Sequence, residues 1–196
     1  MIVKTIKKEN KDINNKAYKF RLYPNKSQQE FIDNTINACR FLYNIMLSDK
    51  IDCYKESKTM LYNTPAMYQN FYTFLKEVDS LALANVQLNL EAAYKNFFKQ
   101  PKVGFPKFKS KHKSKWSYKT NNLGQIYIKD NHITLPKLKS VKLIQHREIE
   151  GTIKSCTISK SKTGKYYISV LCEYESQVEQ KLITNQSLKV GLDYSS

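Results

Sequence analysis

Arginine and acidic residues are both scarce in this sequence. Of its 33 basic residues only Arg21, Arg40 and Arg147 are arginines, and 17 residues are Asp or Glu, so the net charge is +16. A charge of this sign and size indicates a polyanionic partner, which is DNA, RNA or an anionic membrane. The preference for lysine, with abundant Asn, Tyr and Ile, indicates an AT-rich coding sequence more than a choice of chemistry. A merely well-solvated surface is the alternative explanation of the charge.

Long apolar segments are also missing. No apolar run approaches the roughly 20 residues that a membrane-spanning helix requires. Residues 1–15 are rich in Lys and Asn, so we do not interpret them as a signal peptide. Nucleic acid is therefore the favoured partner, no membrane contact is expected, and the expected location is the cytoplasm.

Paired metal-binding cysteines are absent. Cys39, Cys53, Cys156 and Cys172 form no Cys-x-x-Cys pair, and the three histidines do not lie at ligand spacing from them. Zinc binding is therefore not expected. Buried free thiols in a reducing compartment are the simpler interpretation.

The first half of the chain contains one strand followed by helical periodicity. Residues 18–23 alternate as a strand that ends at Pro24, and Ser27 with Glu30 predicts the capping box of a helix. Residues 66–78 predict a second helix, and Asp79 begins a third. The first and third helices have core-facing stripes, Ile32, Ile36, Cys39, Tyr43 and Met46 in one and Val86, Leu90, Ala93 and Phe97 in the other.

Short strands dominate the second half. Residues 126–128 and 132–135 flank an Asp130-Asn131 turn, 141–144 follow Pro136, and 152–159 and 166–174 flank a turn that contains Gly164. The helices do not alternate with the strands. The pattern therefore predicts an α+β fold, a small antiparallel β-barrel interrupted by a helical lobe, and not a doubly wound sheet.

A basic segment lies between the helices and these strands. Residues 92–129 contain ten lysines and no Asp or Glu, and aromatic residues interleave with the lysines of 102–119. Cations for phosphate and flat faces for bases are what a single strand or a nucleic-acid backbone requires. We interpret the aromatics as structural anchors and expect the lysines to contact nucleic acid: Lys102, Lys107, Lys109, Lys111, Lys113, Lys115 and Lys119.

The last strand places an acid at its carboxyl end. Leu188, Val190 and Leu192 alternate with polar or small residues and lead to Asp193. Metal-dependent nucleases need several carboxylates around two divalent ions. Taken alone, an Asp after a strand is more often a turn or cap residue.

These residues together resemble a known family. Residues 16–25, Cys39 to Asn44, 94–99, 104–110, 146–154 and 164–167 occur in the order found in the TnpB (OrfB) proteins of bacterial insertion sequences. Residues 190–193, Val-Gly-Leu-Asp, are similar to the first RuvC motif of that family. The resemblance covers nearly the whole chain.

The resemblance implies an RNA-guided DNA endonuclease related to type V CRISPR effectors. It implies a wedge β-barrel beginning at 16–24, a helical recognition lobe at 25–100 (a helix-turn-helix in older descriptions), a basic segment and further barrel strands at 101–176, and a linker with the first strand of an incomplete RuvC (RNase H-like) domain at 177–196. The expected partners are guide RNA and DNA. Asp193 would be a magnesium ligand.

Counterparts of the other two catalytic acids and of the zinc cysteines are not found in this sequence. We therefore expect no tightly bound magnesium, no cleavage by this chain itself, and poor packing of the residues after Gln177. Lys19, Arg21, Arg40 and Arg147 are further candidate contacts to nucleic acid, with solvent exposure or a salt bridge as the alternative for each arginine. Oligomeric state is left open.

Two functions follow from these expectations. The first is the amino-terminal, nucleic-acid-binding part of a truncated TnpB-type nuclease. The second is a stand-alone RNA- or DNA-binding module that acts as a regulator. A basic ribosome-associated protein would explain neither the order of the motifs nor Asp193.

Overall fold

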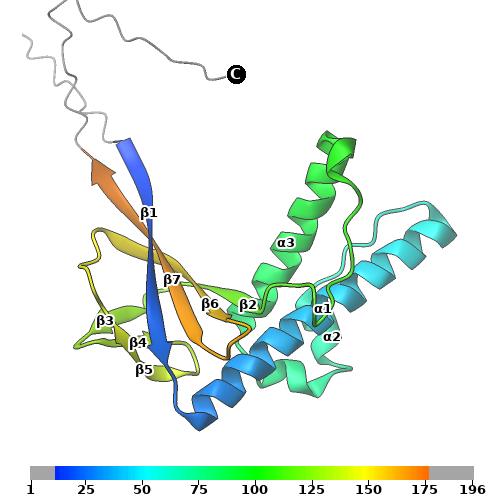
Figure 1. Cartoon of the computed structure of the whole chain (residues 1–196). Coiled ribbons are helices and arrows are strands. Elements are labelled where there is room, and N and C mark those ends of the chain that lie inside the picture. Colours follow the sequence, from blue (N-terminus) through cyan, green and yellow to red (C-terminus); the bar gives the residue numbers. More distant parts are fainter. Residues whose placement is uncertain (1–11, 177–196) are drawn as a thin grey trace, which may run out of the picture.

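The computed structural model describes residues 12–176, which form a seven-stranded sheet, three α-helices and two 3-10 helices (Figure 1). In chain order the elements are β1 (Asp12–Tyr23), α1 (Lys26–Ser57), α2 (Pro65–Gln69), η1 (Thr73–Lys76), α3 (Ser80–Lys99), η2 (Pro101–Val103), β2 (Ser117–Asn121), β3 (Tyr127–Lys129), β4 (His132–Leu135), β5 (Lys139–Ile144), β6 (Thr152–Lys160) and β7 (Tyr166–Ser176). The helices interrupt the strands between β1 and β2, so the α+β class is confirmed for the described residues.

The strands form one curled antiparallel sheet in the order β2-β6-β7-β1-β5-β4-β3. Strand β1 is central because it pairs with β7 over residues 12–22 and with β5 over residues 21–23. Within the described residues β2 and β3 are the two edges of the sheet. The sheet is therefore a half-barrel, which is less than the full barrel that the sequence predicted.

The side chain of Asn122 holds the segment that connects the two edge strands, β2 and β3. The Asn122 amide donates to the carbonyls of Ile126 and Ile153, at 3.1 Å and 3.0 Å. Its Oδ1 accepts from the backbone N–H of Ile126 at 2.9 Å. These bonds satisfy backbone groups of Ile126 and Ile153, and the N–H of Asn122 donates to the carbonyl of Lys154 at 2.8 Å, so the segment after β2 is tied to β6.

Alternation along β1 separates the core from the outward face. Tyr18, Phe20 and Leu22 are each 1% exposed, whereas Lys19 is exposed and Arg21 is partly exposed. Burying one such large side chain contributes about 1.5–3 kcal/mol. The curled sheet thus keeps its apolar side chains inside and presents the other phase of each strand outward.

Helix α1 begins at a different cap from the one predicted. Asn25, not Ser27, is the N-cap, and its Oδ1 accepts from the backbone N–H of Gln28 at 2.9 Å while Gln28 Oε1 accepts from the N–H of Asn25 at 3.0 Å. Pro24 precedes this reciprocal capping box and already ends the strand. The predicted stripe is confirmed, because Ile32, Ile36, Cys39, Tyr43 and Met46 are all buried.

The predicted helix over 66–78 is divided into two short pieces, α2 and η1. The carbonyl of Tyr68 accepts from the N–H groups of both Phe71 and Tyr72, at 3.1 Å and 2.8 Å, which closes a turn where the helix would continue. Helix α3 begins as predicted, with the Asp79 carboxylate accepting from Leu81 N–H at 2.9 Å.

The predicted hairpins are confirmed. Asp130 and Asn131 connect β3 to β4 with φ values of +50° and +56°, and Gly164 (φ +78°) lies in the turn between β6 and β7. Strand β2 was not predicted, because its alternation of Tyr118 and Thr120 with lysine was assigned to the basic segment. The last strand, Asp193 and the predicted poor packing of the tail lie outside the described residues.

Candidate nucleic-acid interface

The outward face of four neighbouring strands carries a row of polar side chains in register. Lys19 of β1 pairs with Ser169 of β7, Ser169 pairs with Thr157 of β6, and Thr157 pairs with Lys119 of β2. Strands are about 4.8 Å apart, so the row is roughly 14 Å long, with a lysine at each end and two hydroxyls between them.

A second row lies one alternation away on the same face. Arg21 pairs with Tyr167, Tyr167 with Ser159, and Ser159 with Ser117. The guanidinium of Arg21 lies 5.1 Å from the centroid of the Tyr167 ring and 5.4 Å from that of Tyr23, and the Arg21 Nε is buried without a hydrogen-bond partner. The two rings orient this cation, which the sequence analysis gave as a candidate contact to nucleic acid.

The basic segment covers part of these rows and creates a groove of about 1290 Å³. We call it the lysine groove; its floor is Ser117, Thr157, Ser159 and Ser169, and its lysines are Lys19, Lys111, Lys113, Lys115, Lys160 and Lys162. Among the described residues that line it, none is acidic. Hydroxyl donors flanked by ammonium groups match the phosphates and sugars of a nucleic-acid backbone.

Trp116 anchors the covering segment. Its indole Nε1 donates to the carbonyl of Lys111 at 2.7 Å, and its own carbonyl accepts from the N–H of Lys160 at 2.9 Å. The ring packs against the core. The indole therefore closes the loop of basic residues onto the sheet, as expected for an anchor.

Lys160 joins the groove to helix α1. Its Nζ lies 2.5 Å from Asp33 Oδ2 and 5.1 Å from the centroid of the Tyr166 ring. Partial burial lowers the pKa of Lys160, but its hydrogen bonds with Asp33, whose carboxylate accepts from the ammonium group, and with Tyr166 outweigh this effect, so the pKa is raised. Lys160 thus remains charged beside the floor of the groove.

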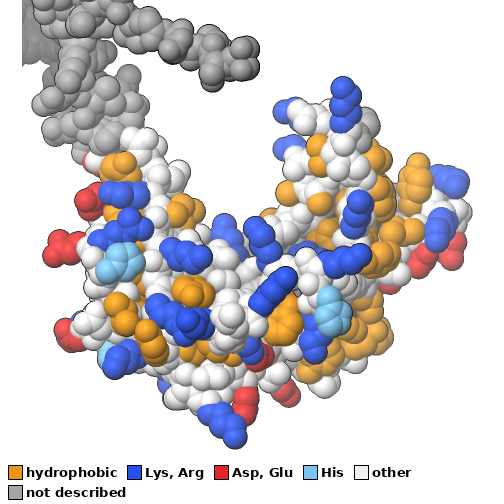
Figure 2. Space-filling model, viewed as in Figure 1, with side chains coloured by type: hydrophobic (Ala, Val, Ile, Leu, Met, Phe, Trp, Pro, Cys, Tyr) orange, Lys and Arg blue, Asp and Glu red, His pale blue; other side chains and the backbone are white. Residues whose placement is uncertain are grey.

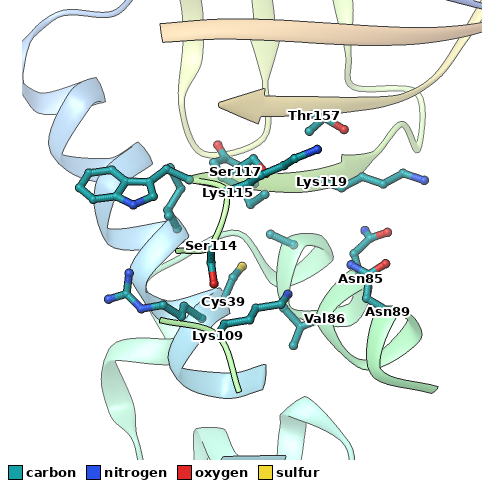
Figure 3. A pocket seen from close by; sticks show the side chains of 15 residues that line it. Cys39, Asn85, Val86, Asn89, Lys109, Ser114, Lys115, Ser117, Lys119 and Thr157 are labelled. Carbon is teal, nitrogen blue, oxygen red and sulfur yellow. The ribbon is translucent and has the colours of Figure 1, made fainter. Parts of the chain in front are cut away.

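A second, smaller cleft adjoins the lysine groove between the sheet and the helices (Figure 3). We call it the asparagine cleft; its polar lining is Arg40, Asn85, Asn89, Lys109, Lys115 and Lys119. In Figure 3 Asn85 and Asn89 project from α3, while Lys115 and Lys119 come from the sheet side. Ser114 to Ser117 and Thr157 line both hollows, so the two are continuous.

Lys109 is the half-buried cation of this cleft. Its Nζ lies 4.0 Å from the centroid of the Tyr43 ring, and burial lowers the pKa of its ammonium group. Burial also raises the pKa of the neighbouring Cys39 thiol to about 12, against a lowering by Lys109. Lys109 is therefore fixed against α1, unlike the exposed lysines that follow it.

The structure brings most of the predicted contact residues together. Lys19, Lys111, Lys113 and Lys115 line the lysine groove, and Arg40, Lys109, Lys115 and Lys119 line the asparagine cleft. Lysines from β1, the basic segment and the edge strand β2 thereby surround one continuous hollow. Their role in binding stays a prediction.

Four predicted residues lie outside both hollows. Lys102 is on η2 and Lys107 is exposed beyond it, while Arg21 is held by the two tyrosines. Arg147 follows β5, with its guanidinium 5.1 Å from the centroid of the Tyr18 ring. Arg21 shares the outward face of the sheet with the groove but does not line it, and none of the other three lines either hollow.

Lys160, Lys162 and the hydroxyl floor were not predicted from the sequence. The two lysines belong to β6 and its turn, which were interpreted only as a hairpin. The sequence feature that could have indicated the floor is the pair of small hydroxyl residues on the outward face of β6, Thr157 and Ser159. Their significance depends on pairing with Ser169 of β7 and with β2, which the sequence alone does not show.

The surface charge agrees with this arrangement. Figure 2 shows Lys and Arg side chains spread over the middle of one face, where the sheet meets the helices, with acidic side chains mainly towards its margins. Such a field attracts polyanions and weakens with salt.

The described residues show neither a membrane span nor a metal cluster. None of their helices combines the length and the apolar character that crossing a membrane requires. Between residues 12 and 176 no three His, Cys, Asp or Glu side chains are grouped to hold a metal ion. Asp193, the expected magnesium ligand, lies outside this range.

Comparison with known proteins identifies the family. Residues 14–59, which form β1 and α1, match the OrfB family of IS605-type elements described as "Helix-turn-helix domain". Two relatives named "Putative RNA-guided DNA endonuclease" are 30% identical over 90% of this chain (InsQ of Escherichia coli strain K12) and 27% identical over 81% (Streptomyces pristinaespiralis). "Virulence protein VsdF" of Salmonella dublin is 33% identical over 50% of this chain.

Coverage differs among these relatives. The chain spans 44% and 41% of the lengths of the two endonuclease-named proteins, and 94% of the virulence protein. The family match begins on the central strand and ends just after α1, so it includes one strand and one long helix. The chain belongs to the TnpB (OrfB) family of insertion-sequence, transposase-associated proteins.

Proposed function

We propose that this chain is the nucleic-acid-binding part of a TnpB-type RNA-guided DNA endonuclease. The lysine groove holds the sugar–phosphate backbone of guide RNA or target DNA. The observation that supports this proposal is the floor of four hydroxyls with six lysines around it, contributed by β1, the basic segment, β6 and the turn after β6. The names of the relatives that share most of this chain support the same function.

The chemistry of the groove favours backbone over base recognition. Lysine ammonium groups and serine or threonine hydroxyls bond phosphate oxygens without distinguishing bases. A protein that leaves sequence recognition to base pairing needs this kind of surface. The few arginines agree with this kind of recognition, because arginine is the residue that recognises guanine edges.

The test is a salt titration of binding to single-stranded RNA, single-stranded DNA and duplex DNA. Lys113→Gln/Lys162→Gln removes two exposed cations that line the lysine groove, one from the basic segment and one from the turn after β6. For single strands we expect the slope of log K against log salt to decrease by about 1.4, because each lost phosphate contact removes about 0.7.

A matched pair of substitutions controls for net charge. Lys129→Gln/Lys142→Gln also removes two exposed cations, from β3 and β5, away from the groove. This control should keep the wild-type slope. Equal losses in both double variants would mean that binding follows net charge and not the groove, and the proposal would then be wrong. Absence of DNA cleavage by this chain stays a prediction, to be checked with added magnesium.

A further inference from the structure

A pocket of different chemistry adjoins the basic hollows on the outer side of α1. It has a volume of about 460 Å³, within the range of small-molecule sites. Phe31 and Phe41 of α1 and Phe74 of η1 supply its aromatic walls. We call it the phenylalanine pocket.

The aromatic walls leave ring surface available. Phe41 and Phe74 meet edge to face, with centroids 5.3 Å apart and planes at 67°. Tyr72 contacts Phe41 in the same way at 4.8 Å. Phe74 is nevertheless 42% exposed. A flat, apolar ligand could therefore cover rings that the fold orients but does not bury.

Polar groups stand at the rim of this pocket. Asn34 and Asn37 are exposed side chains of α1, Arg40 lies one turn further along, and Glu77 faces them from the segment after η1. Arg40 Nη2 donates to Asn37 Oδ1 at 3.0 Å. One guanidinium and one carboxylate leave the lining without net charge, so the pocket does not suit a phosphate.

A nucleobase matches this pocket, because it has flat faces that can stack on the rings and hydrogen-bond donors and acceptors along its edge. Bases stack on aromatic side chains, and asparagine, arginine and glutamate recognise the edges of adenine, guanine and cytosine. The uncharged lining contrasts with the lysine groove, where backbone contacts are expected. The two regions therefore suit two different parts of the same strand.

Arg40 connects the pocket to the basic surface. It lines both the phenylalanine pocket and the asparagine cleft, and the cleft continues into the lysine groove through Lys115 and Trp116. Arg40 is the one lining residue that the cleft and the pocket share, so a strand whose phosphates follow the lysines could reach the aromatic walls across it. This continuity favours a nucleic-acid occupant over an unrelated small molecule.

We propose that the phenylalanine pocket receives one unpaired nucleobase of the strand held in the lysine groove. The base stacks against Phe74 and Phe41, and Asn34 and Asn37 bond its edge. This inference rests on the proposed nucleic-acid binding and adds a base-binding subsite to it. The base can belong to RNA or to DNA, since both present the same stacking faces.

The experiment uses single-stranded RNA and DNA of one sequence, each with 2-aminopurine scanned through successive positions. In the wild-type chain one position should show a marked change of fluorescence on binding. Phe74→Ala should abolish this change and weaken binding at least about fivefold, because stacking on an aromatic contributes roughly 1–3 kcal/mol per base. The salt slope should stay unchanged, because no phosphate contact is lost.

Phe98→Ala is the matched control. Phe98 is 64% exposed near the end of α3, stacked on Tyr94 at 6.3 Å, and lines none of the three hollows. Asn34→Ala provides a second test that leaves the aromatic walls intact and should alter the preference among bases at the scanned position. Thermal melts of all three variants verify folding.

The possible results distinguish the base-binding subsite from its alternatives. Wild-type affinity and fluorescence in Phe74→Ala, or losses no greater than those in Phe98→Ala, would overturn the subsite. So would self-association that Phe74→Ala abolishes, because the pocket would then bind a second copy of the chain. Failure of the wild-type chain to bind either strand would instead refute the proposed function. The RNA and DNA probes show which strand supplies the base.

Discussion

The side chain of Asn44 brackets the backbone of Lys109. Asn44 Nδ2 donates to the carbonyl of Lys109 at 2.9 Å, and Asn44 Oδ1 accepts from the N–H of Lys109 at 2.8 Å. An amide side chain thus imitates a neighbouring strand and joins α1 to a segment 65 residues away. This contact, with the Tyr43 ring beneath the ammonium group, positions the start of the lysine-rich loop.

Asn44→Ala should release that loop. The partly buried backbone groups of Lys109 would lose both partners, which costs about 1–3 kcal/mol. We expect faster hydrogen exchange at the Lys109 amide and faster tryptic cleavage within residues 107–115. Asn96→Ala, an exposed amide on α3, is the control and should change neither. Unchanged exchange at Lys109 would show that other contacts hold the loop.

Ser169 lies at the centre of the groove floor, between Lys19 and Thr157 in register. Ser169→Glu should lower the affinity for single-stranded RNA by about tenfold or more, because a carboxylate opposite phosphate costs several kcal/mol. Unfolding should change little, since the side chain is partly exposed. Fluorescence anisotropy at low salt measures the affinity.

Ser140→Glu makes the same change of charge at an exposed position of β5. This variant should bind almost as well as the wild-type chain. If both variants lose the same affinity, the effect comes from the general field and not from the floor of the groove.

Helices and turns that depend on a few neighbouring residues could be predicted from the sequence. The stripe of α1 and the Asp130-Asn131 hairpin each follow from a few neighbouring residues, and both are confirmed. The predicted cap of α1 was wrong by two residues because two possible capping pairs overlap there, Asn25 with Gln28 and Ser27 with Glu30. Sequence spacing alone could not decide which side chain reaches the free N–H groups.

The lysine groove could be predicted only in part, because it depends on how distant strands pair and not on neighbouring residues. The charge of Lys111 and Lys113 makes them candidate phosphate contacts from the sequence alone. Ser159 and Ser169 are small polar residues whose type alone does not indicate a binding site. They form a floor because antiparallel pairing sets β6 beside β7 in one particular register. The phenylalanine pocket likewise requires the break of the predicted second helix, which turns Phe74 towards α1.

Gly151 should be intolerant of substitution. Its φ is +85°, and a Cβ there would overlap the carbonyl oxygen of Glu173 and lie 2.8 Å from Cβ of Tyr174. Gly151→Ala therefore combines a left-handed backbone cost of about 1–2 kcal/mol with a displacement of β7. Urea denaturation should show a clearly lower free energy of unfolding.

Gly164→Ala separates these two contributions. Gly164 has a similar φ of +78°, but a Cβ would meet no atom within 4 Å. It should lose only the backbone part, about 1–2 kcal/mol. If the two alanine variants are equally stable, then β7 moves away from the added methyl group of Gly151→Ala without lowering the free energy of unfolding.

Stability should decrease at alkaline pH through the buried thiols. Burial raises the pKa of Cys39 and of Cys156 from 9.0 to about 12. Between these values the unfolded chain has released protons that the native chain still holds, so the free energy of unfolding falls as pH rises. The slope is at most about 1.4 kcal/mol per pH unit for each thiol.

Cys39→Ala should reduce this slope, measured by urea unfolding at about pH 8 and about pH 10.5. The variant loses stability at both pH values because it leaves a cavity, but its difference between them should be smaller than in the wild-type chain. Cys53→Ala is the matched control, since it removes a thiol that is only partly buried. Identical slopes in all three proteins would mean that the raised tyrosine pKa values, such as that of Tyr118, control alkaline unfolding without Cys39.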